Sequence, residues 1–78
     1  MKITIKAYSI YSDILGREFN ITLDEEVSLG KLLENLKLKY NIPEKPEPVV
    51  LVNGEPAQPG RILRDGDVIY IAPPFSGG

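Results

Sequence analysis

The chain has 78 residues and a formal net charge of -2, and it contains neither cysteine nor histidine. Such a length allows one domain with a small core, and the two missing residue types exclude disulfides, thiolate metal sites, thiol nucleophiles and histidine bases. Because the charge is weakly acidic and no basic run occurs, we expect no nucleic-acid partner. Because no long apolar stretch occurs, we expect no membrane partner and a cytoplasmic location. Without cysteine and histidine, we also expect no bound metal.

The N-terminal part is expected to form a hairpin of two strands. Apolar and polar residues alternate from Lys2 onward, which is typical of a strand with one buried face, and we expect this strand to run to about Tyr11. A turn near Gly16 then leads into a second alternating strand. The inward positions expected in the two strands are Ile3, Ile5, Ala7, Phe19, Ile21 and Leu23.

The middle of the chain changes to a helical period. The apolar residues of its stripe are Leu29, Leu32, Leu33, Leu36 and Tyr40. Ser28 is the expected N-cap, and Pro43 prevents continuation, so the helix should end near Tyr40 or Asn41. The acidic run at 24–26 precedes the positive end of the helix dipole, and we interpret it as dipole compensation rather than as a metal or acid–base cluster.

Two further strands are expected in the C-terminal half. The apolar run "VVLV" at 49–52 predicts a central strand buried on both faces. Turns are expected at Asn53-Gly54 and at Asp65-Gly66. In the last strand, which Pro73 and Pro74 should end, we expect two residues to face the helix, Ile69 and Ile71, and three to face away, Val68, Tyr70 and Ala72.

This order predicts an α+β domain over 1–74, in which one main helix packs across one face of a mixed sheet. The last strand is expected to lie centrally and to lead into a flexible tail over 75–78, with the sequence "FSGG". Tyr8, Val68 and Tyr70 are expected to form an exposed apolar surface on the face opposite the helix. We consider this surface a candidate partner-binding site.

The last two residues of the tail, Gly77 and Gly78, are candidate functional residues. Glycine lacks a Cβ and can enter a channel too narrow for other residues, while Pro73 and Pro74 would hold the base of the tail extended. The α-carboxylate of Gly78, with a pKa of about 3.3 to 3.7, is ionised and needs activation before it can react. Since no group in the chain could perform that step, we expect a substrate or carrier rather than an enzyme. Phe75 is expected to be an interface anchor.

The segment "LRDGDVIYIAPPFSGG", together with the order of strands and helix and with "YSDILG" at 11–16, resembles the β-grasp sulfur carriers of the ubiquitin-like superfold. The similarity is greatest to the small subunit of molybdopterin synthase. The resemblance implies that Gly78 is adenylated by an ATP-using, ubiquitin-activating-type enzyme and receives sulfur from a donor protein. It further implies that the resulting thiocarboxylate enters a large synthase subunit in a heterotetramer, with Pro73, Pro74, Phe75, Ser76 and Gly77 contacting the partners. No cofactor would be bound by the chain itself.

Other interpretations of the same residues stay open. Within the superfold, the chain could carry sulfur for thiamine thiazole or tRNA thiolation, or it could be a ubiquitin-like modifier joined to lysines through Gly78. A β-grasp binding module with an incidental tail is a further alternative, from a different class. The Pro-Pro pair before the tail favours the molybdopterin branch.

Overall fold

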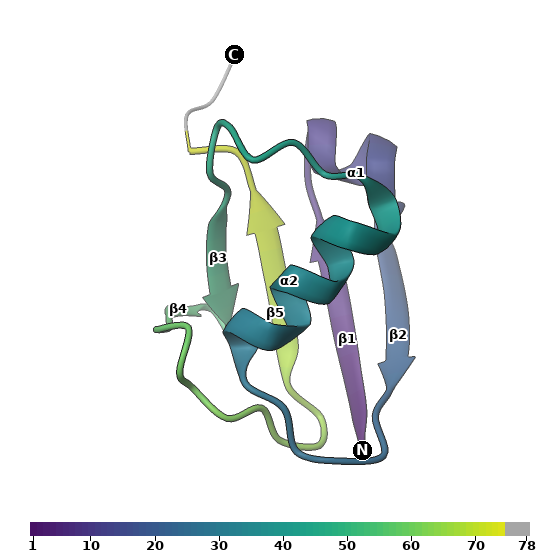
Figure 1. The fold of residues 1–78 in the computed structure, drawn as a ribbon, viewed down its shortest axis with the longest axis vertical. Helices are drawn as coiled ribbons and strands as arrows, with labels where there is room; N and C mark the ends of the chain where they lie inside the picture. The colour runs from purple at the N-terminus through teal and green to yellow at the C-terminus, as the bar shows by residue number, and fades with distance from the viewer. Residues whose placement is uncertain (75–78) are drawn as a thin grey trace.

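The computed structural model describes residues 1–74, which form one five-stranded mixed sheet with a helix lying across one of its faces (Figure 1). The strand order is β2-β1-β5-β3-β4, in which β1 and β5 run parallel and the other pairs run antiparallel. The elements are β1 Lys2–Ala7, α1 Ile10–Leu15, β2 Glu18–Thr22, α2 Leu29–Tyr40, β3 Val49–Val52, β4 Glu55–Pro56 and β5 Val68–Ala72. The α+β architecture predicted from the sequence is confirmed.

The main helix, α2, begins and ends where its sequence signals predict. The hydroxyl oxygen of Ser28 accepts the backbone N–H of Lys31 at 3.2 Å, which satisfies one of the unpaired donors of the first turn. Asn41 follows the last turn in the left-handed conformation, with φ 54°, and its N–H bonds to the carbonyl of Lys37. Leu29, Leu32 and Leu36 are buried against the sheet. No helix among residues 1–74 has the length and apolarity needed to cross a membrane.

The first strand is shorter than predicted. It ends at Ala7, and Ser9 then adopts φ 56°, a left-handed value that breaks the strand and starts the short helix α1. Tyr11, expected at the end of the strand, lies in this helix and is buried with Leu15 four residues later. The antiparallel β1–β2 pairing is confirmed, with α1 inserted before the turn at Gly16, where φ is 91°.

The prediction that 49–52 forms a central strand buried on both faces is wrong. β3 lies between β5 and the two-residue edge strand β4, and α2 lies across only one face of the sheet (Figure 1). Among residues 1–74, the other face of β3 therefore has no covering layer. Val52 is buried, whereas Val49 is 42% exposed. The apolar run at 49–52 therefore has side chains on both the core face and the open face of the sheet, because successive side chains of a strand point to opposite faces.

The last strand occupies the centre of the sheet, as predicted. β5 pairs with β1 on one side and with β3 on the other. Ile69 and Ile71 are buried beneath the helix, while Val68, Tyr70 and Ala72 are only partly buried. The predicted facing of these residues is confirmed. Because β5 is the middle strand, its C-terminal end lies at the centre of one end of the sheet.

Candidate functional site

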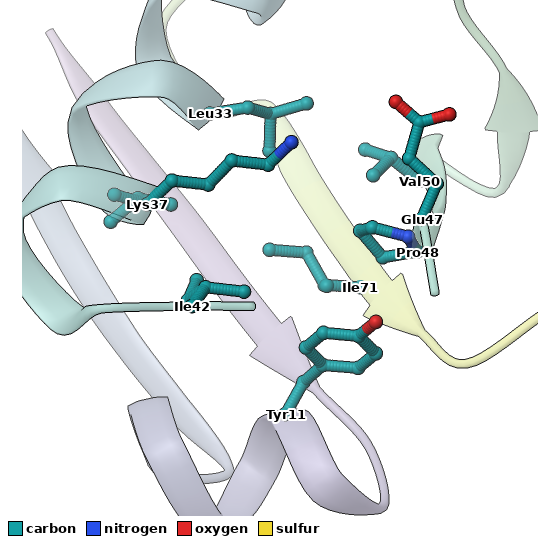
Figure 2. Close-up of a pocket in the computed structure, with 9 residues that line it drawn as sticks. Tyr11, Leu33, Lys37, Ile42, Glu47, Pro48, Val50 and Ile71 are labelled. Atoms are coloured by element: carbon teal, nitrogen blue, oxygen red, sulfur yellow. The ribbon is translucent and has the colours of Figure 1, made fainter. Parts of the chain in front are cut away.

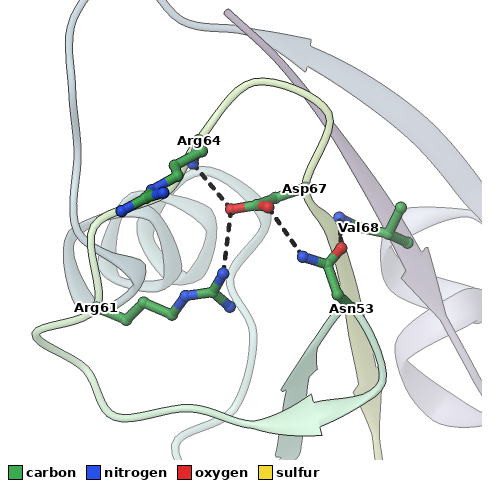
Figure 3. Close-up of polar contacts among 5 residues, drawn as sticks. All are labelled: Asn53, Arg61, Arg64, Asp67 and Val68. Atoms are coloured by element: carbon green, nitrogen blue, oxygen red, sulfur yellow. Dashed lines mark hydrogen bonds and ion pairs between the residues drawn. The ribbon is translucent and has the colours of Figure 1, made fainter.

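The N-terminal end of β5 is held by a carboxylate network around Asp67 (Figure 3). Asp67 is 6% exposed. One of its carboxylate oxygens accepts the Asn53 side-chain amide at 2.9 Å, and the other accepts the Arg64 backbone N–H at 2.8 Å. A guanidinium nitrogen of Arg61 lies 3.7 Å from the second oxygen, and the Asn53 side-chain oxygen accepts the Val68 N–H at 2.9 Å. The network joins both turns at this end to the first residue of β5.

The pKa of the Asp67 carboxyl lies below its usual range. Burial acts to raise this pKa, but the hydrogen bonds from Arg64 and Asn53 and the positive charges of Arg61 and Arg64 together outweigh it. The carboxylate is therefore stabilised in its ionised form. Asp67 therefore has a structural role beside the turn glycine, Gly66, where aspartate is favoured for local hydrogen bonding.

Replacing Asp67 with alanine is expected to lower the free energy of unfolding by about 1–2 kcal/mol, because Asn53 and Arg64 lose a buried acceptor. Since the pKa is lower in the folded state, the stabilisation is present above the unfolded value of about 3.9 and is lost as pH falls through the folded value. Urea unfolding over a pH series checks this. Asp67→Asn should show a weaker loss of stability in acid than the wild type, and an identical acid dependence would contradict the assignment.

The C-terminal end of β5 is where the tail leaves the domain. Val49 pairs with Ala72 at the last register position, and the Tyr8 N–H donates to the Ile71 carbonyl at 2.9 Å. Pro73 and Pro74 follow, and because proline has no N–H the ladder cannot continue through them. The tail therefore starts from a strand anchored on both sides. The remaining predicted tail residues, Phe75, Ser76, Gly77 and Gly78, lie outside the described residues.

An apolar surface lies on the open side of the sheet, next to this exit. The Tyr8 and Tyr70 rings are 6.4 Å apart between centroids and tilted by 43°, and Val68 lies on the same face of β5 as Tyr70. Tyr8 is 49% exposed. The register adds residues that the sequence interpretation missed, because Leu51 pairs with Tyr70 and Val49 with Ala72. We define the sheet-face patch as Tyr8, Val49, Leu51, Val68, Tyr70 and Ala72.

The other half of the same face is polar. The Thr4 hydroxyl donates to the Asn20 side-chain oxygen at 2.9 Å, between β1 and β2. The Lys6 ammonium lies 3.9 Å from the Glu18 carboxylate and 5.8 Å from the centroid of the Tyr70 ring. Lys6 thus marks the boundary between the two halves. A partner that binds the apolar half would meet a charged rim on its β1 side.

A small apolar cavity lies on the helix side of the sheet, near the same end (Figure 2). It has a volume of about 80 Å³. Most of its lining residues are apolar and come from α2, β3, β5 and the loop that joins α2 to β3, and two charged residues, Lys37 and Glu47, also line it. Ligand clefts usually measure about 300–1,000 Å³, so this cavity is too small for a substrate. Nor does any group of three or more possible metal ligands occur among residues 1–74.

Tyr11 borders this cavity and ties α1 to the loop before β3. Its hydroxyl donates to the Pro46 carbonyl at 3.0 Å, and burial raises the pKa of the phenol. Tyr11→Phe keeps the ring but leaves that carbonyl without its donor. We expect the free energy of unfolding to fall by about 1 kcal/mol, measured by chemical denaturation. An unchanged stability would contradict the contribution assigned to this hydrogen bond.

The mixed five-stranded sheet, with one main helix across it and the tail leaving the central strand, defines a ubiquitin-like β-grasp domain. A model described as the ThiS family matches residues 5–78. The chain therefore belongs to the ThiS family, and the resemblance to β-grasp sulfur carriers noted in its sequence is confirmed. A search among curated proteins gave no match.

Solved structures agree with this fold. The putative molybdopterin converting factor subunit 1 of Pyrococcus furiosus is 24% identical, with a TM-score of 0.83 over 96% of this chain and 99% of that one. Small archaeal modifier protein 1 of Haloferax volcanii is 21% identical, with a TM-score of 0.78 over 95% of this chain and 98% of that one. In a Helicobacter pylori complex of subunits 1 and 2 of molybdopterin-converting factor, the matching chain is 25% identical, with a TM-score of 0.71 and full coverage of both chains.

Proposed function

We propose that the protein is a sulfur carrier that acts as the small subunit of a molybdopterin synthase, with the carboxylate of Gly78 as its reacting group. The observation that carries this proposal is the placement of the tail. It follows the central strand of a ThiS-family β-grasp domain and leaves the sheet at Pro73 and Pro74, beside the sheet-face patch. A rigid base and an adjoining apolar surface suit a chain end that must be presented to another protein's active site.

The proposed chemistry has two activation steps and one transfer. A carboxylate oxygen of Gly78 attacks the α-phosphate of ATP on an activating enzyme, and pyrophosphate leaves. Sulfur at the oxidation level of sulfide, supplied by a donor protein, then attacks the acyl carbon. AMP departs as the leaving group, and the product is a thiocarboxylate. In the synthase, the thiocarboxylate sulfur attacks an electrophilic carbon of the pterin precursor and displaces an oxygen leaving group from that carbon. Water then hydrolyses the acyl–sulfur bond, which leaves the sulfur on the precursor and restores the Gly78 carboxylate. ATP is used by the activating enzyme, and the chain itself supplies the carrier.

The partners follow from the same proposal. The sheet-face patch would bind the activating enzyme, and Phe75 would add an anchor in the tail. A large synthase subunit as a second partner is supported by the Helicobacter pylori neighbour, which was solved as a complex of subunits 1 and 2. We propose a heterotetramer with two copies of each subunit, in the cytoplasm.

The proposal is tested by the intact mass of the protein after incubation with host extract, ATP and a sulfur donor. A mass increase equal to the exchange of one oxygen for one sulfur is expected, and it should be absent from a variant that lacks Gly78. A second test is rescue of molybdenum-cofactor synthesis in host cells without their own small subunit. Thiocarboxylate formation without that rescue would redirect the carrier to thiamine or tRNA thiolation.

A second candidate is a ubiquitin-like modifier, which the likeness to small archaeal modifier protein 1 favours. Here a lysine of a target protein, after losing a proton from its ammonium, would attack the adenylated Gly78 carbonyl through its neutral amine. AMP would leave, and an amide would join the two proteins. Tagged protein expressed in host cells should then give a ladder of conjugates that persists under reducing, denaturing conditions. Its absence from cells in which the thiocarboxylate accumulates would exclude this role.

A further inference from the structure

The two edges of the sheet differ in how well they are protected. At one edge lies β4, which has only two residues, one of them Pro56, and proline lacks the N–H that a further strand would use. At the other edge lies β2, which has five residues and contains no proline. Among residues 1–74, β1 is the only strand that pairs with β2 (Figure 1).

The pairing register identifies the backbone groups that β2 directs outward. Met1 and Leu23 exchange two hydrogen bonds, of 2.8 and 3.1 Å, and the Ala7 N–H donates to the Arg17 carbonyl at 3.0 Å. Because inward and outward groups alternate along an antiparallel strand, the odd-numbered residues of β2 bond to β1. The N–H and C=O groups of Glu18, Asn20 and Thr22 therefore face the free edge.

A groove runs beside this edge, between β2 and α2. Its volume is about 360 Å³, which lies within the range of ligand clefts. Phe19 and Ile21 are partly buried and belong to the helix side of the sheet, and the Phe19 ring lies 6.3 Å from the Tyr40 ring between centroids. We define the β2–α2 groove by its lining residues, which are Phe19, Asn20, Ile21, Leu23, Leu32, Asn35, Leu36, Lys39 and Tyr40.

The charges at the two ends of the groove are opposite. Lys39 lies at the Phe19 end, where its ammonium is 5.5 Å from the centroid of the Tyr40 ring, and it forms no ion pair with any described residue. At the other end, β2 continues into Leu23 and the acidic run at 24–26. A strand added antiparallel to β2 would place its C-terminal end beside Lys39 and its N-terminal end near the acidic residues.

We propose that the free edge of β2 and the β2–α2 groove together bind an extended peptide segment of a partner protein. The segment pairs antiparallel with β2 through Glu18, Asn20 and Thr22, and its alternate apolar side chains enter the groove. A carboxylate near its C-terminal end contacts Lys39. The site lies on the helix side of the sheet, so it is separate from the sheet-face patch and does not depend on the proposed sulfur-carrier function.

The test uses a synthetic peptide of about eight residues, within the usual length of strands. Valine and threonine alternate in it, and two aspartates follow at its C-terminal end. On titration into the ¹⁵N-labelled full chain, the largest amide shifts should occur at Glu18, Asn20, Thr22 and Lys39, and hydrogen exchange at the three strand amides should slow. Placing the aspartates at the N-terminal end should weaken binding about threefold.

Matched variants separate the charge contact at Lys39 from the backbone hydrogen bonds along β2. Lys39→Glu should weaken binding of the first peptide by about threefold to fivefold, whereas Lys31→Glu, the same charge change near the start of the helix, should alter it less than about twofold. N-methylation of the peptide amides that face β2 should weaken binding by about tenfold or more, because it removes the backbone hydrogen bonds.

Three results would overturn the proposal. The first is no binding at millimolar peptide, and the second is shifts confined to Val68, Tyr70 and their neighbours on the opposite face. The third is protection of the β2 amides that depends on protein concentration in the absence of peptide. That result would assign the edge to a second copy of the chain.

Discussion

Gly77→Val is expected to slow thiocarboxylate formation by about 100-fold or more while leaving the unfolding temperature unchanged. The proposed reaction requires the chain end to reach an activating enzyme through a space that excludes side chains, and a displacement of about 1 Å at the reacting carbon is enough for such a loss. The measurement is the rate of sulfur incorporation, followed by intact mass with the host's activating enzyme, ATP and a sulfur donor.

The matched control is Gly60→Val, which makes the same chemical change within the domain. A Cβ at Gly60 would meet no heavy atom within 4 Å, so the larger side chain should be accommodated there. Sulfur incorporation should match the wild type. Equal rates for Gly77→Val and Gly60→Val would remove the steric argument for the terminal glycines and favour a binding module with an incidental tail.

Tyr70→Ala is expected to raise the dissociation constant for the activating enzyme by about 30-fold, corresponding to about 2 kcal/mol of binding free energy. Tyr70 is the central aromatic residue of the sheet-face patch, with Tyr8 on one side and Leu51 on the paired strand. Truncation removes a contact that the proposed interface would bury. Isothermal titration calorimetry with the purified activating enzyme gives the value.

Thr22→Ala provides the control for this surface, because Thr22 is exposed on β2, in the polar half of the same face. It should change the dissociation constant by less than about threefold. If both variants bind alike, the activating enzyme contacts the tail or another face, and the sheet-face patch loses its proposed role. Thermal unfolding of each variant distinguishes a lost contact from a lost fold.

Much of the fold was predictable because several local signals agreed. The leucine period of α2 coincided with an N-cap at Ser28 and a barrier at Pro43, so both its face and its bounds followed from the sequence. The alternation in β5 correctly separated Ile69 and Ile71 from Tyr70. Its central position followed from the topology of an α+β layer with one helix.

The misses have physical causes. α1 has only six residues, too few to show a helical period, and the aromatic and β-branched residues Tyr8, Ile10 and Tyr11 are also typical of strands, so a strand extending past Ala7 fitted the same sequence. The break depends on a left-handed Ser9, which no glycine or proline announces. For β3, composition records that residues are apolar, but not whether a second layer covers them. Val49 and Leu51 were therefore assigned to the core, although they extend the sheet-face patch.

The parallel pairing of β1 with β5 has a consequence for how the protein is made. These are the first and the last strands among residues 1–74, so the centre of the sheet is a contact of very large sequence separation. The hairpin and α2 can begin to form during synthesis, but the core cannot close until β5 has been translated, and such non-local closure is slow. The domain and the chain that follows β5 should therefore become functional together. A truncated product that ends before β5 should not fold, and so it should not compete with the full chain for its partner proteins.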